Sequence, residues 1–474
     1  MIRKLIMGLT LLAALSLVWP ASSFITVLAA KNAVADEARL LSPPSRIQTF
    51  TPLVLTGRQA LTQTNTYTFY LPLVFRNACA DSFSYNETLR YNLTKINIEA
   101  AWQRCSQGQG ITIAVIDTGV DLDHPDLQAN LVTGKTFVSG TGTADDDQGH
   151  GSHVAGIIAA VHNNGGVIGV APEASLLPVK VLDSAGSGSI SDVADGIIWA
   201  ADNGADVINL SLGSVAGSAT LKAAVDYAYN QGVLLVVAGG NCGDAAYYLN
   251  GCSYQDQPLY PGAYTNVIAV AATDSSDNQS SFSNQGSYID IAAPGSTIYS
   301  TYPAGSYATM SGTSMATPHL AGLAALVWSQ NSDLTSQEVW AQIRNTADDL
   351  GASGWDQQFG YGRIDAAAAM GALQTTSTTA ADDSLAEISA AAAETQAPYI
   401  AGELLLKLRT GFTVNQVLDP VELGTADAKV ADTIDQIGVQ KLTVTSGQEQ
   451  TVLAQLRNSM GIEYAELNYV VTIR

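Results

Sequence analysis

The stretch Ile-Thr-Ile-Ala-Val-Ile-Asp-Thr-Gly, residues 111–119, decides the fold class of this chain. It opens with a short apolar run, as expected of a parallel strand buried on both faces. Further apolar runs follow at residues 175–181, 207–210, 233–238 and 267–271. Helical patterns lie at residues 152–161, 190–203, 220–231, 314–330 and 336–346. Strands that alternate with helices predict an α/β fold, with a mainly parallel sheet between two helical layers.

The rest of the chain divides around this α/β region. The 474 residues are too many for one ordinary domain. We expect a signal peptide at residues 1–35, an extended leader at 36–80, the α/β domain at 81–372 and an Ala/Thr/Ser-rich linker at 373–396. A small domain at residues 397–474 completes the chain. Its pattern predicts strands at 402–408, 439–445 and 463–473 and helices at 426–437 and 448–459, which is an α+β arrangement.

The N-terminus indicates a secreted protein, and the charge disfavours one class of partner. Arg3 and Lys4 precede an apolar stretch, as in a secretory signal. An uncleaved anchor is the alternative, because no charge appears between Leu5 and Ala30. The formal charge of −22 disfavours nucleic acid as a partner. We expect no stable membrane partner.

Four cysteines fit an oxidising compartment and allow three pairings. Cys242 and Cys252 bracket one loop rich in Gly, Asn and Tyr, which favours that pair. Cys79 and Cys105 remain, and their disulfide would join the N-terminal segment to the α/β domain. Free buried thiols are the alternative.

Three segments carry side chains suited to nucleophilic catalysis. Asp117 ends the first strand, at the edge of a parallel sheet where sites form. His150 stands between two glycines, and imidazole titrates near neutrality, as a general base should. Ser314 follows Gly-Thr before an apolar helix, where the helix dipole favours negative charge. The alternatives are structural: a buried Asp, a satisfied His, for which His153 is the better candidate, and an N-cap Ser.

Together these segments resemble the three signatures of the subtilisin-like serine protease family. They read Asp-Thr-Gly, His-Gly-Ser-His-Val-Ala-Gly and Gly-Thr-Ser-Met-Ala-Thr-Pro-His, in the family's order. Ser152 is a departure, since Thr is usual there. The resemblance covers residues 91–370 and implies a subtilisin-like three-layer sandwich. It also implies a catalytic triad of Asp117, His150 and Ser314, and an acyl-enzyme mechanism that hydrolyses peptide bonds of protein or peptide substrates.

The resemblance also implies further site residues. Asn241, otherwise a turn residue, corresponds to the oxyanion-hole Asn. Two segments should hold the substrate backbone as a strand: Gly186, Ser187, Gly188 and Ser211, Leu212, Gly213. Gly239 and Gly240 would line a roomy S1 pocket that accepts large apolar side chains.

A structural Ca²⁺ site is implied as well. Its ligands would be Asp126 and Asn163, with carbonyls of Val161, Gly165 and Val167, all of which are hard oxygen donors. Asp145, Asp146 and Asp147 form either a second, weak calcium site or a solvated acidic loop.

The C-terminal domain resembles the inhibitory pro-domain of the same family, which implies a ferredoxin-like fold. Such domains normally precede the protease, whereas this one follows it. We expect it to dock as an intramolecular chaperone and inhibitor, with residues 471–474 in subsites S4 to S1. A trailing adhesion or dimerisation module is the alternative.

Two other functions fit the residues less well. An esterase of the α/β-hydrolase type needs a Gly-x-Ser-x-Gly elbow and the order Ser, Asp, His. A non-enzymatic binding protein on a protease scaffold is expected to lack a triad member, and none is missing. The sequence therefore predicts a secreted serine endopeptidase, held inactive by its own C-terminal domain.

Overall fold

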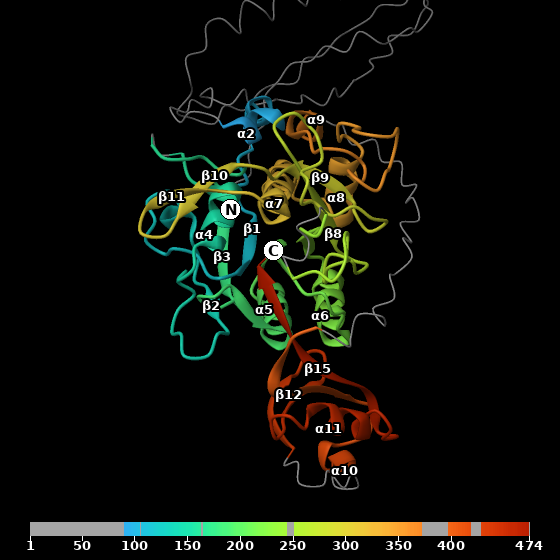
Figure 1. Cartoon of the computed structure of the whole chain (residues 1–474). Helices are drawn as coiled ribbons and strands as arrows, with labels where there is room; N and C mark the ends of the chain where they lie inside the picture. Colours follow the sequence, from blue (N-terminus) through green and yellow to red (C-terminus); the bar gives the residue numbers. More distant parts are fainter. Residues whose placement is uncertain are drawn as a thin grey trace, which may run out of the picture. The chain divides into compact units, whose positions relative to one another are not determined.

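The α/β domain is built around a seven-stranded parallel sheet in the order β2-β3-β1-β5-β7-β8-β9 (Figure 1). A computed structural model describes residues 90–104, 106–162, 165–243, 251–371, 397–418 and 428–473. The strands of this domain are β1 Thr112–Asp117, β2 Lys135–Thr136, β3 Ser175–Lys180, β4 Ser187–Ser189, β5 Val207–Leu210, β6 Leu212–Gly213, β7 Leu234–Ala238, β8 Ile268–Thr273, β9 Ile291–Pro294, β10 Ile298–Tyr302 and β11 Ser306–Met310. Its helices are α2 Tyr91–Lys95, α3 Ile98–Trp102, the 3₁₀ turn Gln128–Asn130, α4 His150–Ala159, α5 Ile190–Asp202, α6 Ala219–Asn230, α7 Thr313–Gln330, α8 Ser336–Arg344 and α9 Ala366–Gly371.

Side chains of β1 alternate between two hydrophobic cores, one on each face of the sheet. Ile113 and Val115 belong to the core that includes residues of α4 and α7. Ala114 and Ile116 belong to the core that includes residues of α5 and α6. Successive residues of a strand point to opposite faces, so the central strand is covered on both sides. The predicted three-layer α/β fold is therefore confirmed.

Serine side chains cap the N-termini of α5 and α6. Ser189 caps α5 by accepting a hydrogen bond from the Asp192 N–H, and Ser218 caps α6 by accepting one from the Leu221 N–H. Helix α7 differs, because all its residues from Thr313 to Trp328 are buried. A helix that is buried all round belongs to the interior of the domain.

The predicted strands and helices of this domain all appear, and none of their ends is shifted by more than two residues. The β10–β11 hairpin and the short α2, α3 and α9 were not predicted. Residues 1–89 and 372–396 lie outside the described residues, and with them the predicted signal, leader and linker. Within the part of the chain that the structure describes, none of the helices has the length and apolarity needed to span a bilayer.

The C-terminal domain, over its described residues 397–418 and 428–473, is an antiparallel sheet with two helices. Its elements are β12 Tyr399–Leu408, α10 Val414–Leu418, β13 Lys429–Ile434, β14 Val439–Thr443, α11 Glu449–Leu456 and β15 Ile462–Ile473. The strand order β13-β14-β12-β15 and the βαββαβ sequence are those of a ferredoxin-like fold, as predicted.

One element of that domain was predicted wrongly. Residues 426–437 were expected to be a helix, but Lys429–Ile434 is a strand that pairs antiparallel with β14. Four of its six residues are exposed, so its side chains give little apolar alternation to recognise. Pairing with β14 overrides the helical propensity of this Ala-containing segment.

Candidate active site

Asp117 and His150 meet at the carboxyl edge of the parallel sheet. Asp117 is the last residue of β1 and His150 the first of α4. His150 Nδ1 lies 2.8 Å from Asp117 Oδ1 and 3.0 Å from Oδ2. Both side chains are buried, and the Thr118 N–H donates to Asp117 Oδ1 at 2.7 Å. The carboxylate is thus held from two sides and faces the ring nitrogen that the predicted mechanism requires.

Ser314 reaches the same edge from the second position of α7. Its hydroxyl donates to the carbonyl of Ser211 at 3.2 Å, and the Ser211 hydroxyl donates to the carbonyl of Ser314 at 2.9 Å. Ser211 directly follows β5, the strand that pairs with β1. Reciprocal hydrogen bonds between these two serines therefore fix the start of α7 against the strand next to Asp117.

Asn241 follows β7 and points at the start of the same helix. Its Oδ1 accepts hydrogen bonds from the Thr313 N–H and the Thr313 hydroxyl, both at 2.9 Å. The amide nitrogen is the donor end of this side chain. Thr313 thus orients the amide beside Ser314, in the arrangement expected of an oxyanion-hole Asn.

Glycines around His150 permit close backbone approach. A Cβ on Gly149 would lie 2.2 Å from the ring of Tyr302, and Gly149 has φ +112°. A Cβ on Gly151 would lie 2.0 Å from the carbonyl oxygen of Gly119. Helix α4 can therefore start against the β1 turn only with glycine at these two places.

Asp146 is a buried part of the site that the sequence did not reveal. Its Oδ1 accepts from the Thr118 hydroxyl and from the N–H groups of Gln148 and Gly149, at 2.8 to 3.0 Å. Its Oδ2 accepts from the Ser152 N–H and hydroxyl at 2.9 and 2.6 Å. Asp146 thereby joins the turn after Asp117 to the first turn of α4. The N-cap of α4 is Gly149, so the position of Asp146 four residues before the helix gave no N-cap signal.

Lys180 is a fully buried cation next to this turn. It pairs in register with Asp117 across β1 and β3, and its Nζ donates to Asp147 Oδ1 at 2.6 Å and to the Leu182 carbonyl at 2.9 Å. The Thr118 carbonyl is a third acceptor. Asp146 is therefore bound within the domain, and the interpretation as a solvated acidic loop is wrong for it, whereas Asp145 and Asp147 are exposed as that interpretation expects.

Two other histidines are structural. His153 Nε2 lies 3.1 Å from the Ile298 carbonyl, and burial lowers the pKa of His153 to about 4. His319 Nδ1 lies 2.8 Å from the Met315 carbonyl, and burial likewise lowers the pKa of His319 to about 4. Both rings are neutral near pH 7.

The two predicted substrate-binding segments are paired with a strand of the C-terminal domain. Strand β15 runs antiparallel to β4, with Val471 opposite Gly188 and Thr472 opposite Ser187. It also runs antiparallel to β6, with Ile473 opposite Leu212. The Ile473 N–H donates to the Gly186 carbonyl at 3.0 Å. Residues 471–473 thus lie between the two segments predicted to hold a substrate, and Arg474, predicted with them, lies outside the described residues.

Polar side chains of β15 also contact the N-termini of two helices. Glu466 accepts from the Ser218 hydroxyl at 2.7 Å and from the Ala219 and Thr220 N–H groups at 2.9 Å, at the start of α6. Asn468 accepts from the Ser191 N–H at 3.1 Å, at the start of α5. Both contacts satisfy helix N–H groups that lack partners within the helix.

The predicted disulfide between Cys242 and Cys252 is present, with Cα atoms 6.0 Å apart. Cys79 and Cys105 lie outside the described residues. Gly239 and Gly240 directly precede Asn241, and the Gly240 N–H donates to the Thr313 hydroxyl at 3.1 Å.

The described residues fit the predicted calcium site in part. Asp126 is buried, but its Oδ2 already accepts from the Val167 N–H at 3.0 Å and from the Tyr307 hydroxyl at 2.8 Å. Asn163 lies outside the described residues. A carboxylate and the carbonyls of residues 161, 165 and 167 are suitable donors for Ca²⁺. The calcium site stays a prediction.

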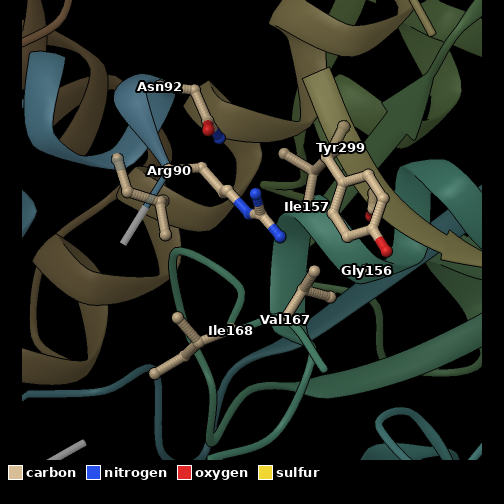
Figure 2. Close-up of a pocket in the computed structure, with 9 residues that line it drawn as sticks. Arg90, Asn92, Gly156, Ile157, Val167, Ile168 and Tyr299 are labelled. Atoms are coloured by element: carbon tan, nitrogen blue, oxygen red, sulfur yellow. The ribbon is translucent and has the colours of Figure 1, made fainter. Parts of the chain in front are cut away.

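A separate pocket lies beside this loop (Figure 2). It is small, and on its wall the Arg90 guanidinium stacks 4.4 Å from the ring centre of Tyr299. Asn92 Nδ2 lies 2.7 Å from His319 Nε2. The pocket contains no residue of the predicted triad, and it borders the predicted calcium site only through Val167.

Comparison with known proteins matches the α/β domain and the C-terminal domain to two different family models. Residues 108–362 match the model of the subtilase family, peptidase S8. The chain belongs to the subtilase family. Thermitase of Thermoactinomyces vulgaris is 48% identical over 283 residues, 60% of this chain and 96% of thermitase. Subtilisin Savinase of Lederbergia lenta is 44% identical over 60% of this chain and 99% of its own length.

Residues 386–468 of this subtilase match the model of the fervidolysin N-terminal prodomain. The resemblance of the C-terminal domain to a subtilase pro-domain is thereby confirmed. A thermophilic serine proteinase of Bacillus sp. strain AK1, 44% identical over 292 residues, covers 61% of this chain. The chain is a subtilisin-like serine endopeptidase that acts on protein substrates.

Proposed function

We propose that this subtilase is a secreted endopeptidase with a triad of Asp117, His150 and Ser314, inhibited by its own C-terminal domain. The observation that carries the chemistry is the hydrogen bond between His150 Nδ1 and Asp117 at 2.8 Å. It leaves Nε2 as the ring nitrogen that takes a proton. Secretion rests on Arg3 and Lys4 before the apolar N-terminal stretch.

The reaction proceeds in two halves. Ser314 Oγ attacks the peptide carbonyl carbon while its proton passes to His150 Nε2. The resulting oxyanion takes hydrogen bonds from Asn241 Nδ2 and from the Ser314 N–H at the start of α7. His150 then protonates the leaving amine as the C–N bond breaks, which gives the acyl-enzyme. Water deacylates it by the same proton path, and Asp117 stabilises the imidazolium throughout.

Residues Gly186–Gly188 and Ser211–Gly213 hold the substrate backbone in this proposal. Each offers a short strand edge, and β15 pairs with both in the structure. Backbone pairing binds an extended peptide with little dependence on its side chains. Gly239 and Gly240 leave room for a large apolar P1 side chain. A calcium ion held by Asp126 and the loop of residues 161–167 would stabilise the fold and takes no part in the reaction.

Inhibition by the C-terminal domain is supported by where β15 lies. Its residues Val470–Ile473 take the strand position between β4 and β6 that a substrate needs. Val471 is fully buried there. A peptide and β15 cannot pair with the same two edges at once, so docking excludes substrate. We also retain the division into signal 1–35, leader 36–80, catalytic domain 81–372, linker 373–396 and inhibitor domain 397–474.

A chromogenic peptide assay tests both parts of the proposal. The full-length chain and a chain ending at Gly371 are compared, each with its Ser314→Ala variant. We expect the shortened chain to be more active and both Ser314→Ala variants to lose about 10⁶-fold in kcat, the size of loss known for subtilisin. Activity that survives in Ser314→Ala contradicts the triad. A shortened chain that folds equally well and is no more active contradicts inhibition.

A further inference from the structure

Asn284 is a fully buried amide that contacts the segment around Asn241 from 42 residues away in the sequence. Its backbone N–H donates to the Gly240 carbonyl at 2.9 Å. Its Oδ1 accepts from the Cys242 N–H at 2.5 Å. These two groups lie on either side of Asn241, so one residue holds both flanking peptide units.

The side chain of Asn284 is itself fixed. Its Nδ2 donates to the Gln257 carbonyl and to the Tyr288 hydroxyl, both at 2.8 Å. Tyr288 in turn donates to the Gly239 carbonyl at 2.8 Å. The donors and the acceptor of this amide are thus all engaged, which sets its orientation. A buried network with every member satisfied is rigid.

Gly240 fits this close contact. A Cβ at Gly240 would lie 2.7 Å from Asn284 Nδ2, and Gly240 has φ +112°. Only glycine lets the backbone adopt this conformation at that distance.

The disulfide gives the same segment a second anchor. Cys242, directly after Asn241, is bonded to Cys252, and both are buried. The Cys242 carbonyl accepts from the Asp256 N–H at 2.7 Å. Residue 242 is therefore held through its N–H by Asn284, through its carbonyl by Asp256 and through its side chain by Cys252.

We propose that Asn284 is a positioning residue for the oxyanion hole, acting on Asn241 through the two peptide groups that flank it, with the Cys242–Cys252 disulfide as the second anchor. The inference rests on the proposed role of Asn241. An oxyanion donor acts only when it lies at hydrogen-bond distance from the developing charge, and a displacement of about 1 Å can cost about 10²-fold in rate. Thr313 sets the orientation of the Asn241 amide, and Asn284 sets the position of the backbone that carries it.

The test is a double-mutant cycle in the full-length chain, with active sites titrated by an irreversible serine-directed reagent. Asn284→Ala is expected to lower kcat by about tenfold or more and to change KM by less than about threefold. In the Asn241→Ala background the same substitution is expected to have no further effect on kcat, since its target is gone. Asn278→Ala, at an exposed Asn whose amide bonds Asp274, is the matched control with unchanged kcat.

Cys242→Ser with Cys252→Ser provides the second arm, should Asn284→Ala fail to fold. The same cycle with Asn241→Ala is measured, and the same loss of additivity is expected. Equal kcat losses with and without Asn241, or folded variants with unchanged kcat, overturn the proposal. If Asn241→Ala alone keeps full kcat, the proposed role of Asn241 fails first, and that outcome is seen before any Asn284 variant is measured.

Discussion

The catalytic domain and the C-terminal domain contribute to the candidate active site by different means. Asp117, His150 and Ser314 stand at the ends of elements that share two continuous cores. The buried side chains of Asp146 and Lys180 hold the turn that follows Asp117. The C-terminal domain pairs residues 470–473 of β15 with β4 and β6. Its Glu466 and Asn468 cap helices α6 and α5. Substitutions in the catalytic domain should therefore abolish the reaction. Substitutions in the C-terminal domain should change the fraction of molecules in which that domain is undocked.

Asp117→Asn tests the first half of this comparison and has the largest expected effect. Asn cannot hold the imidazole in the required tautomer, so kcat should fall by about 10⁴-fold. The loss should be equal in the full-length chain and in a chain ending at Gly371, because it arises within the catalytic domain. Asp226→Asn, at an exposed partner of Lys222, is the control. A loss under tenfold, measured on titrated enzyme, would contradict the role given to Asp117.

Val471→Asp tests the second half. Val471 is fully buried opposite Gly188, and a carboxylate there would be buried without a partner, at a cost of about 3–5 kcal/mol. The docked state should open, and activity of the full-length chain should rise on the order of 10²-fold or reach that of the chain ending at Gly371. Val430→Asp makes the same change at an exposed position on β13 and should leave activity unchanged. Equal activities of the two variants would contradict inhibition through β15.

The two regions also differ in how far the sequence predicts them. Strands β1, β3, β5 and β7 are buried on both faces and read as continuous apolar runs, so the order of strands and helices could be predicted. Edge strand β13 is mostly exposed, and its pairing with β14 is invisible in its own residues. The C-terminal domain was therefore predicted with one helix in place of a strand.

Within the site, local signals were predictive and distant contacts were not. The glycines beside His150 and the small residues before Ser314 are neighbours in the sequence, and they indicated that these two side chains belong to the site. Asp146 looked like a solvated acid, because its hydrogen-bond partners Thr118 and Ser152 come from either side in the chain and meet only in the fold. Asn284 contacts Cys242 across 42 residues, and no pattern in a single sequence indicates such a pair.

Glu466→Gln tests how much the cap on α6 contributes to docking of the C-terminal domain, and its expected effect is smaller than that of Val471→Asp. Glu466 accepts three hydrogen bonds at the start of α6, where a negative charge is also favoured by the helix dipole. Gln keeps one acceptor oxygen and removes the charge. Docking should weaken by about tenfold, since hydrogen bonds to charged groups contribute about 1.5–3 kcal/mol. Glu463→Gln, on the same strand but paired with Lys407 of its own domain, is the control. Inhibition that is equally tight in both variants would show that the cap adds nothing to docking.

The smallest expected effect is on pH dependence, through Asp195 of α5. The pKa of Asp195 is raised to about 7, first by burial and then by the negative charges of Asp432 on β13 and Asp192, while Lys441 and Lys135 oppose the shift. Asp432 and Lys441 belong to the C-terminal domain, so undocking removes the Asp432 repulsion together with the smaller attraction of Lys441. The pKa of Asp195 should therefore be lower in the open state than in the docked state.

The direction of the pH effect follows from proton binding. Between the two pKa values, the docked state holds a proton on Asp195 that the open state has lost, so docking weakens as pH rises toward about 7 and changes no further above it. Each unit of difference between the two pKa values changes the docking constant by at most about tenfold. The ratio of full-length activity to that of the chain ending at Gly371, taken at each pH, removes the pH dependence of catalysis itself. Asp195→Asn mimics the protonated form, so in this variant the ratio should be the same at every pH and equal to the low-pH value of the unsubstituted chain. A ratio that still depends on pH in this variant would assign the effect to another group.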